Sequence, residues 1–292
     1  MAEIHHFTYG VFNPLAAYLL AFLGSFFGLL CTGRARNART RSRRNRWLGI
    51  AAVAIGGGAI WLMHFTAMLG FDVPASPVRY DVTVTVLSLV AGVAAVGLGL
   101  LIVGHGRRSL IKVACGGVLT GGGVLAMHYT GMYAMHVAGR VHYDPSLLVA
   151  SGIIAVVASA VALWFTISVR GVSRITIAAA IMAIAVCGMH YTGMAAMSVT
   201  LDMNAAEAVH GIRPLTMIVP ITLITAASII GVALSALQAM TEEEFTDGAG
   251  TPRRGLHAES SNAWSLKQAS MPAQPARRPS PRPVPIRSTS NS

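Results

Sequence analysis

The stretch Met127-His128-Tyr129-Thr130-Gly131-Met132 occurs again, letter for letter, at residues 189–194, and with two substitutions at residues 63–68. Its three histidines, at positions 64, 128 and 190, are 64 and 62 positions apart (128 − 64 and 190 − 128). Each copy lies at the end of a long apolar stretch. An internal repeat of this kind fixes the architecture before any local pattern is considered, because every copy must build the same unit.

The composition is that of a helical membrane protein. The 292 residues are 54% hydrophobic and 11% charged, and the mean hydropathy is +0.60, whereas a soluble domain has about 25% charged residues. The apolar stretches are about 20 residues long, as a membrane-spanning helix requires. A transmembrane barrel would show alternating segments of about 10 residues. We therefore predict an all-α, polytopic membrane bundle.

Seven transmembrane helices are predicted, as three helix-pair repeats plus one helix. The second helix of each pair ends in a copy of the motif. Residues 1–10 contain no Lys or Arg, so we interpret the first apolar stretch as a retained helix and not a secretory signal. The membrane domain covers residues 11–240, with helices over about 11–31, 47–69, 82–103, 111–135, 146–169, 175–197 and 214–240. Residues 241–292 are rich in Pro, Ser and Arg and are predicted to be a disordered tail.

The basic residues predict the orientation of this bundle. The loops after the first, third and fifth helices carry 12 Lys and Arg and no acid, whereas the N-terminus and the other three loops carry three basic and six acidic residues. Excess Lys and Arg marks the cytoplasmic side. The N-terminus is therefore expected outside, the C-terminus in the cytoplasm, and all three motif copies near the outer face. Without an aromatic-basic surface for stacking bases, the net charge of +11 does not predict a nucleic-acid partner.

Each motif copy offers one imidazole and one thioether on the same helix face, because residues i and i+4 lie above one another. A further methionine precedes each histidine and lies on the flank. Imidazole with thioether favours copper, and thioether in particular favours Cu(I). Haem is a less favoured alternative, since His/Met and His/His are known axial pairs. The candidate metal ligands are His64, Met68, His128, Met132, His190 and Met194, with Met63, Met127 and Met189 on the flanks.

Packing alone accounts for most single methionines or histidines in membrane helices. Three matched copies favour a site, because polar side chains in a span are costly and face the bundle interior. Two glycine runs, 56–58 and 121–123, lie one to two turns before His64 and His128 and predict close approach of helices. From this we expect the motif helices to form an inner layer. Tyr129 and Tyr191 fit an aromatic belt at the membrane interface as well as a role at the site.

The hexads resemble the MHYT domain, a bacterial integral-membrane sensor module, over about residues 8–240. The resemblance implies a sensory role in the bacterial inner membrane. It also implies copper bound through the Met and His residues of the motif, and a response to O2, CO or NO. The first copy departs from the pattern at Phe65 and Ala67. Members often carry cyclic-dinucleotide, kinase or DNA-binding output domains. This sequence shows no such domain, so an unknown cytoplasmic signalling protein is expected as its partner, with membrane lipid around it.

The sequence thus predicts a membrane sensor that binds copper near the outer face and responds to a diatomic gas or to redox state. The alternative is a protein for copper transport, storage or handling, which would need a polar or Met-lined path toward the cytoplasm. The motif helices are instead rich in Gly, Ala and Ile below the motif. An enzyme is not predicted, because no nucleophile, acid–base pair or phosphate loop accompanies the motif.

Overall fold

A computed structural model describes residues 3–202 and 209–217, with single residues between 219 and 234. Within these residues, six helices are long and apolar enough to cross a membrane. The all-α, multi-pass architecture is therefore confirmed. The helices are α1 (Phe12–Asn37), the continuous span α2 (Arg41–Ala52), η1 (Val53–Leu62) and α3 (Met63–Met68), α4 (Val82–Gly104), α5 (Leu110–Tyr133), α6 (Pro145–Ser168) and α7 (Val172–Ala195).

The predicted seventh helix, 214–240, lies largely outside the described residues. Its first residues, Pro214–Met217, form a single 3₁₀ turn, η3. The predicted tail, 241–292, also lies outside the described residues. The seven-helix count and the three-repeat architecture therefore stay predictions.

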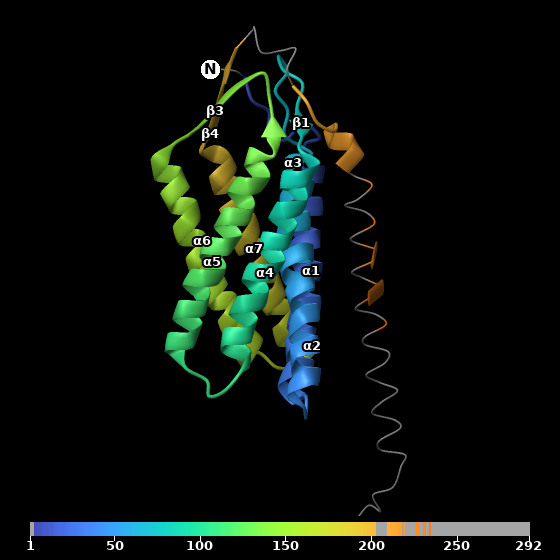
Figure 1. Ribbon diagram of the computed structural model, residues 1–292, viewed down its shortest axis with the longest axis vertical. Helices are drawn as coiled ribbons and strands as arrows, with labels where there is room; N and C mark the ends of the chain where they lie inside the picture. Colours follow the sequence, from blue (N-terminus) through green and yellow to red (C-terminus); the bar gives the residue numbers. More distant parts are fainter. Residues whose placement is uncertain are drawn as a thin grey trace, which may run out of the picture. The chain divides into compact units, whose positions relative to one another are not determined.

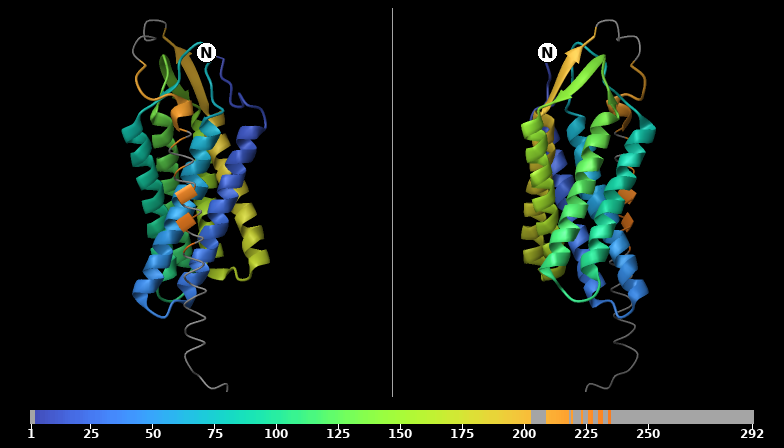
Figure 2. Two further views of the ribbon diagram at one scale, coloured as in Figure 1. Left: turned by 90° about the vertical axis from the view of Figure 1, so that its right-hand side faces the viewer. Right: turned by 60° about the vertical axis from the view of Figure 1, so that its left-hand side comes forward.

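The contacts between the six spans form a closed ring, in which each span packs against its neighbours in the chain and α7 packs back against α1. The spans run along the long axis of the molecule (Figures 1 and 2). Short connections favour this order, because consecutive antiparallel helices pack side by side. The span from Arg41 to Met68 is the most enclosed, with 83% of its apolar window buried against 22–44% for the other spans. The expected inner layer of three motif helices is therefore wrong for α5 and α7.

Glycine allows the backbones of neighbouring spans to touch. A Cβ on Gly24 of α1 would lie 2.3 Å from the backbone nitrogen of Ala59, and a Cβ on Gly56 would lie 2.8 Å from the carbonyl oxygen of Gly92. A Cβ on Gly121 of α5 would lie 2.6 Å from the Cα of Val156. A side chain at these positions would force the helices apart. The predicted packing role is confirmed for Gly56 and Gly121.

The arginine-rich connection between the first two spans is shorter than predicted. Of residues 32–46, only 38–40 are outside a helix, since α1 continues to Asn37 and α2 begins at Arg41. Arginine is a good helix former, and the side chain of Thr40 caps α2 by accepting a hydrogen bond from the Arg43 amide. Arg36 donates from its guanidinium to the carbonyls of Thr166 and Val169 and so ties α1 to the end of α6.

Two short antiparallel sheets form in loops that the sequence did not predict to be ordered. β1 (Arg79–Tyr80) pairs with β2 (Met135–His136), and β3 (Gly139–Tyr143) pairs with β4 (Met197–Leu201). In both pairings, the strand just before an outgoing helix (α4 or α6) pairs with the strand just after the motif helix that follows it (α5 or α7). The same step recurs in two backbone hydrogen bonds. The amide of Asp81 donates to the Ala134 carbonyl and the amide of Asp144 donates to the Ala196 carbonyl, each at 2.8 Å. The two connections between successive motif copies thus share one structural step.

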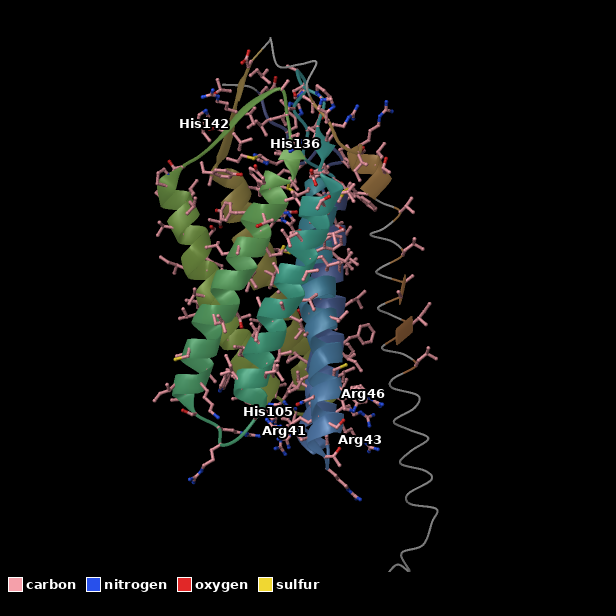
Figure 3. The ribbon with its side chains drawn as sticks, viewed as in Figure 1. Arg41, Arg43, Arg46, His105, His136 and His142 are labelled. Atoms are coloured by element: carbon pink, nitrogen blue, oxygen red, sulfur yellow. The ribbon has the colours of Figure 1, made fainter. Side chains whose placement is uncertain are left out.

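The two ends of the ring differ in character (Figure 3). One end, called the motif end, carries the β strands, the exposed His136 and His142, and the ends of the motif helices. The other, called the basic end, carries Arg41, Arg43 and Arg46. This division matches the charge segregation in the sequence.

Candidate metal centre

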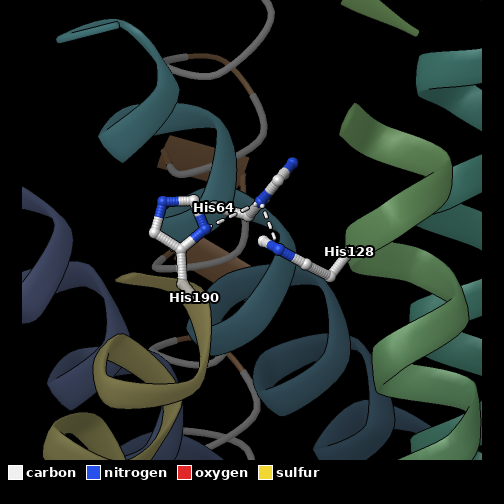
Figure 4. A group of neighbouring side chains, drawn as sticks. All are labelled: His64, His128 and His190. Carbon is white, nitrogen blue, oxygen red and sulfur yellow. Dashed lines mark hydrogen bonds between the residues drawn. The ribbon is translucent and has the colours of Figure 1, made fainter. Parts of the chain in front are cut away.

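Three histidines from separate helices meet near the motif end, inside the ring (Figure 4). His64 comes from α3, His128 from α5 and His190 from α7, and each side chain is 0–1% exposed. Nδ1 of His64 lies 3.0 Å from Nδ1 of His190 and 3.1 Å from Nδ1 of His128. The ring centroids are 4.9–5.2 Å apart, with the planes nearly perpendicular. These three residues are called the histidine triad.

The triad forms because the spacing of the repeat brings the motif back to the same depth. Between two histidines the chain leaves the motif end along its loop, crosses the bundle once and returns in the next motif helix. Each motif helix then turns its histidine inward, since a polar side chain in a span is stabilised by facing the interior. The predicted convergence of His64, His128 and His190 is confirmed.

Two motif glycines make room for the rings, a role that the sequence analysis missed. A Cβ on Gly131 would lie 2.5 Å from Nε2 of His64, and a Cβ on Gly193 would lie 2.4 Å from Nε2 of His128. Each ring therefore rests against the glycine of the next copy. The sequence feature that indicates this role is the glycine shared by both full copies of the motif.

An aromatic side chain follows each histidine and packs edge-on against it. The ring centroids lie 4.7 Å apart for Phe65 with His64, 4.9 Å for Tyr129 with His128, and 5.0 Å for Tyr191 with His190. Tyr129 is fixed further by a 2.9 Å hydrogen bond between its hydroxyl and that of Ser151. These side chains restrict the rotation of the imidazoles.

Polar atoms without a hydrogen-bond partner are concentrated around the triad. Among the buried side-chain atoms of the described residues, seven of the ten without a partner lie toward the motif end. Leaving a buried polar group unsatisfied costs about 1–3 kcal/mol each, so each of these atoms calls for a bound water or another hydrogen-bond partner. The seven atoms are Nε2 of His64, His128 and His190, Nδ1 of His6, Oγ1 of Thr66, and the hydroxyls of Tyr80 and Tyr191.

The donor set of the triad fits a transition-metal ion. The ligand atoms lie within 4.8 Å of one another, and in the described part of the chain no carboxylate or thiol joins the group. Two imidazole nitrogens, each about 2.0 Å from one ion in tetrahedral geometry, would be about 3.3 Å apart. The observed 3.0 and 3.1 Å need only a slight opening of the rings. Both contacts are hydrogen bonds between Nδ1 atoms, and an ion bound there would replace the protons that they share.

The predicted methionine ligands are all buried, at 0–4% exposed, but their surroundings differ. Met63 packs with Ala17 and Ala183 in a cluster apart from the main core. The side chain of Met127 lies against Gly92 of α4, and Met189 lines an internal cavity. Ligation by the sulfurs stays a prediction for the whole set, which is Met63, Met68, Met127, Met132, Met189 and Met194.

Sequence comparison identifies the repeat. Residues 57–116 and 121–179 each match MHYT, described as a bacterial signalling protein N-terminal repeat. The matched stretches contain His64 and His128, and the third motif copy follows them. The match agrees with the repeated structural step between the motif helices.

The relatives are signalling proteins that are longer than this chain. The bifunctional diguanylate cyclase/cyclic di-GMP phosphodiesterase MucR of Pseudomonas aeruginosa is 38% identical over 233 residues, which are 76% of this chain and 34% of MucR. The cyclic di-GMP phosphodiesterase NbdA of the same organism is 36% identical over 196 residues, 65% of this chain and 24% of NbdA. The signaling protein YkoW of Bacillus subtilis is 30% identical over 210 residues, 68% of this chain and 25% of YkoW.

The chain spans about a third or a quarter of the length of these curated relatives. No solved structure matches it. The alignment with MucR is much longer than the two matched repeats together, and it includes more than half of the residues in the membrane spans. Through its repeats at residues 57–116 and 121–179, this multi-pass membrane chain belongs to the MHYT family of bacterial signalling proteins.

Proposed function

We propose that this chain is the sensor module of a bacterial signalling system and that its histidine triad binds a copper ion. The observation that carries the proposal is the convergence of three buried imidazoles, one from each motif helix, at Nδ1 distances of 3.0 and 3.1 Å. Imidazole is a borderline ligand that suits copper, and buried thioethers in the same helices favour Cu(I). Three imidazoles also suit zinc, so metal analysis must identify the ion.

Haem is a poorer fit to the same geometry. Two axial imidazoles bind iron from opposite faces of the macrocycle, with their nitrogens about 4 Å apart for metal–nitrogen bonds near 2 Å. The triad nitrogens instead converge on one point from three helices. No macrocycle can be placed between rings whose centroids are 4.9–5.2 Å apart.

Bound copper would supply a redox-active centre with affinity for diatomic gases such as O2, CO and NO. The protein holds the three imidazoles in one arrangement, through the glycines and aromatic side chains of the motif, and excludes water from them. Because His64, His128 and His190 belong to three different helices, a change of ligation at the ion would be transmitted to α3, α5 and α7 together. The ten-residue π-helical segment η1 continues directly into α3, and π-helical turns are frequent at functional sites. This span carries the change toward the basic end.

The charge bias supports placing the motif end outside and the basic end in the cytoplasm. The N-terminus is then extracytoplasmic and the C-terminus cytoplasmic in the inner membrane. Residues 1–10 lie outside, 11–240 form the membrane domain, and 241–292 form a cytoplasmic tail. An unknown cytoplasmic signalling protein receives the signal. The relatives that are cyclic di-GMP enzymes match this chain in a region described as an N-terminal repeat, which supports a module without catalysis of its own.

The interior below the triad favours a sensor over a copper transporter. A cavity of about 50 Å³ lies between the helices and is lined mainly by aliphatic side chains, with Met182 and Met189 on one helix. Its polar lining residues are Ser25, Thr120, Ser159 and Thr166. A copper path needs a series of soft donors along the membrane normal, and the lining of this cavity does not provide one.

Metal analysis of the purified protein in lipid nanodiscs tests the proposal. The wild type is expected to hold one copper ion per chain after exposure to Cu(I) and removal of the excess. The His64→Ala/His128→Ala/His190→Ala variant is expected to hold none, with an unchanged helical circular-dichroism spectrum. His136→Ala/His142→Ala is the matched control, because these histidines are exposed at the same end. Copper in the wild type no higher than in the triple variant would refute the site.

A second measurement addresses the sensing role. Adding NO or CO to the copper-loaded protein is expected to change its vibrational or optical spectrum and the hydrogen exchange of α3, α5 and α7. A loaded protein that shows no change with either gas, and none between oxidised and reduced states, would leave the metal site standing but contradict the sensor. Copper accumulation by vesicles containing the protein would instead favour the transport alternative.

A further inference from the structure

The N-terminal segment lies across the motif end and is fastened there at both sides. The amide and carbonyl of His5 pair with those of Asp72 at 2.9 Å. The amide and hydroxyl of Thr8 both donate to the carbonyl of Gly70, at 3.0 and 2.9 Å. On the other side, the ring of Phe7 lies 5.7 Å from that of Tyr191 in α7. The segment therefore bridges the ends of α3 and α7, which carry His64 and His190.

Two adjacent histidines in this segment have opposite environments. Side chains alternate between two faces along an extended backbone. His5 points outward, with 47% of its side chain exposed and Nε2 bonded to Glu3 at 3.0 Å. His6 points inward and is half-buried, with its ring centroid 5.8 Å from that of Phe71. His5 therefore serves as the control for His6 in an experiment on this segment.

The imidazole of His6 has a free donor atom aimed into the protein. Its Nδ1 is buried and has no hydrogen-bond partner, which is costly unless a ligand uses the atom. His6 precedes Phe7, whose ring centroid lies 5.7 Å from that of Tyr191, the residue that follows His190. His6 does not belong to the group of donor atoms within 4.8 Å of one another. His6 therefore stands next to the triad without being part of it.

We propose that His6 is a transfer ligand, which takes a soft or borderline metal ion at the motif end and delivers it to the histidine triad. This inference rests on the proposed metal site. The triad itself is closed to solvent, at 0–1% exposed, so an ion must pass the segments that cover the motif end to reach it. His6 offers a donor on a segment that bridges the ends of the helices of His64 and His190.

The transfer is a ligand exchange without change of oxidation state. Neutral His6, with its proton on Nε2, donates the Nδ1 lone pair to the ion. The triad nitrogens then replace Nδ1, and His6 returns to its free form. A residue with this role changes the rate of loading but not the final occupancy. Since the equilibrium is unchanged, loading and removal must slow by the same factor.

Stopped-flow loading of nanodisc-embedded protein with Cu(I), supplied from a chromophoric Cu(I) chelator, tests this role. His6→Phe keeps an aromatic ring against Phe71 but has no donor atom. It is expected to slow both loading and chelator-driven removal by about 10-fold, the effect of losing about 1.4 kcal/mol of transition-state stabilisation, with the dissociation constant and one-to-one stoichiometry unchanged. His6→Met keeps a soft donor and is expected to restore the rates. His5→Ala is expected to match the wild type.

Each alternative outcome has a definite meaning. Wild-type rates in His6→Phe would overturn the inference while leaving the metal site intact. A lower affinity or stoichiometry in His6→Phe would overturn it as well, since His6 would then be a resident ligand. A wild type that takes up no Cu(I) at all would refute the proposed metal site, and the transfer role with it.

Discussion

Replacing Gly193 with alanine tests how tightly the motif positions the histidine of the preceding copy. The new Cβ would lie 2.4 Å from Nε2, 3.1 Å from Cδ2 and 3.3 Å from Cε1 of His128. Because ordinary contact begins at 3.4 Å, the ring must retreat by about 1.0 Å to restore normal van der Waals separation. His128 is 0% exposed, so no solvent-filled space receives it.

A retreat of that size affects both stability and binding. Overpacking of a buried site costs about 1–3 kcal/mol of the free energy of unfolding. Ligand sites tolerate displacements of about 0.5 Å, so moving one imidazole twice as far should lower copper affinity by about 10–100-fold, as disturbing the support of a ligand does. Gly188 is the matched control on the same helix, since a Cβ there meets nothing within 4 Å.

The assay is competition for Cu(I) against a chromophoric chelator, with thermal unfolding measured on the same samples. Gly193→Ala is expected to lose affinity and stability, whereas Gly188→Ala keeps the affinity and gains up to about 1 kcal/mol from the higher helix propensity of alanine. Equal copper affinity in Gly193→Ala and the wild type would contradict the argument. It would mean that the imidazole of His128 does not need its observed position.

Three further outcomes follow from groups away from the triad. Asp81→Ala is expected to lower the free energy of unfolding by about 1 kcal/mol, because Asp81 caps α4 by accepting a hydrogen bond from the Val84 amide. Ser109→Ala, at the uncapped start of α5, should have no effect. Chemical denaturation in mixed micelles compares the two variants. Ser25→Ala should leave thermal stability unchanged or raise it by about 1–3 kcal/mol, since its hydroxyl is buried without a partner; a clear loss would mean that the hydroxyl holds a bound molecule. Burial, with Tyr129 nearby, raises the pKa of Tyr143 to about 12. Its neutral form therefore stabilises the fold fully below pH about 10, and this stabilisation is lost as the pH rises through about 12. The difference in phenolate absorbance between the wild type and Tyr143→Phe should have its midpoint at pH about 12 and not at about 10.

The convergence of the histidines was predictable because it follows from periodicity alone. Apolar stretches of membrane length fixed six of the spans, and copies 64 and 62 positions apart had to return to one depth. The cost of a polar side chain in lipid then decided that His64, His128 and His190 face inward. None of these steps depends on how individual side chains pack.

The missed features depend on contacts between segments distant in the sequence. β3 and β4 pair residues about 60 positions apart, and neither strand alone distinguishes itself from a polar loop. The clearance at Gly131 and Gly193 is set by rings from the preceding copy. The difference between His5 and His6 depends on how the N-terminal segment meets residues 70–72. A pattern within one segment of the sequence therefore cannot predict these contacts between distant segments.

The departures of the first motif copy from the other two follow from this chain order. His64 rests against the glycine of the second copy and His128 against that of the third, so in both full copies the glycine makes room for the imidazole of the preceding copy. The corresponding residue of the first copy is Ala67, which is buried at 5% exposed. Phe65 likewise needs no hydroxyl, because it packs among Trp61, His64 and Tyr80. The two substitutions thus spare the imidazole and alter only its neighbours in the motif, which is the pattern expected if all three histidines serve one site.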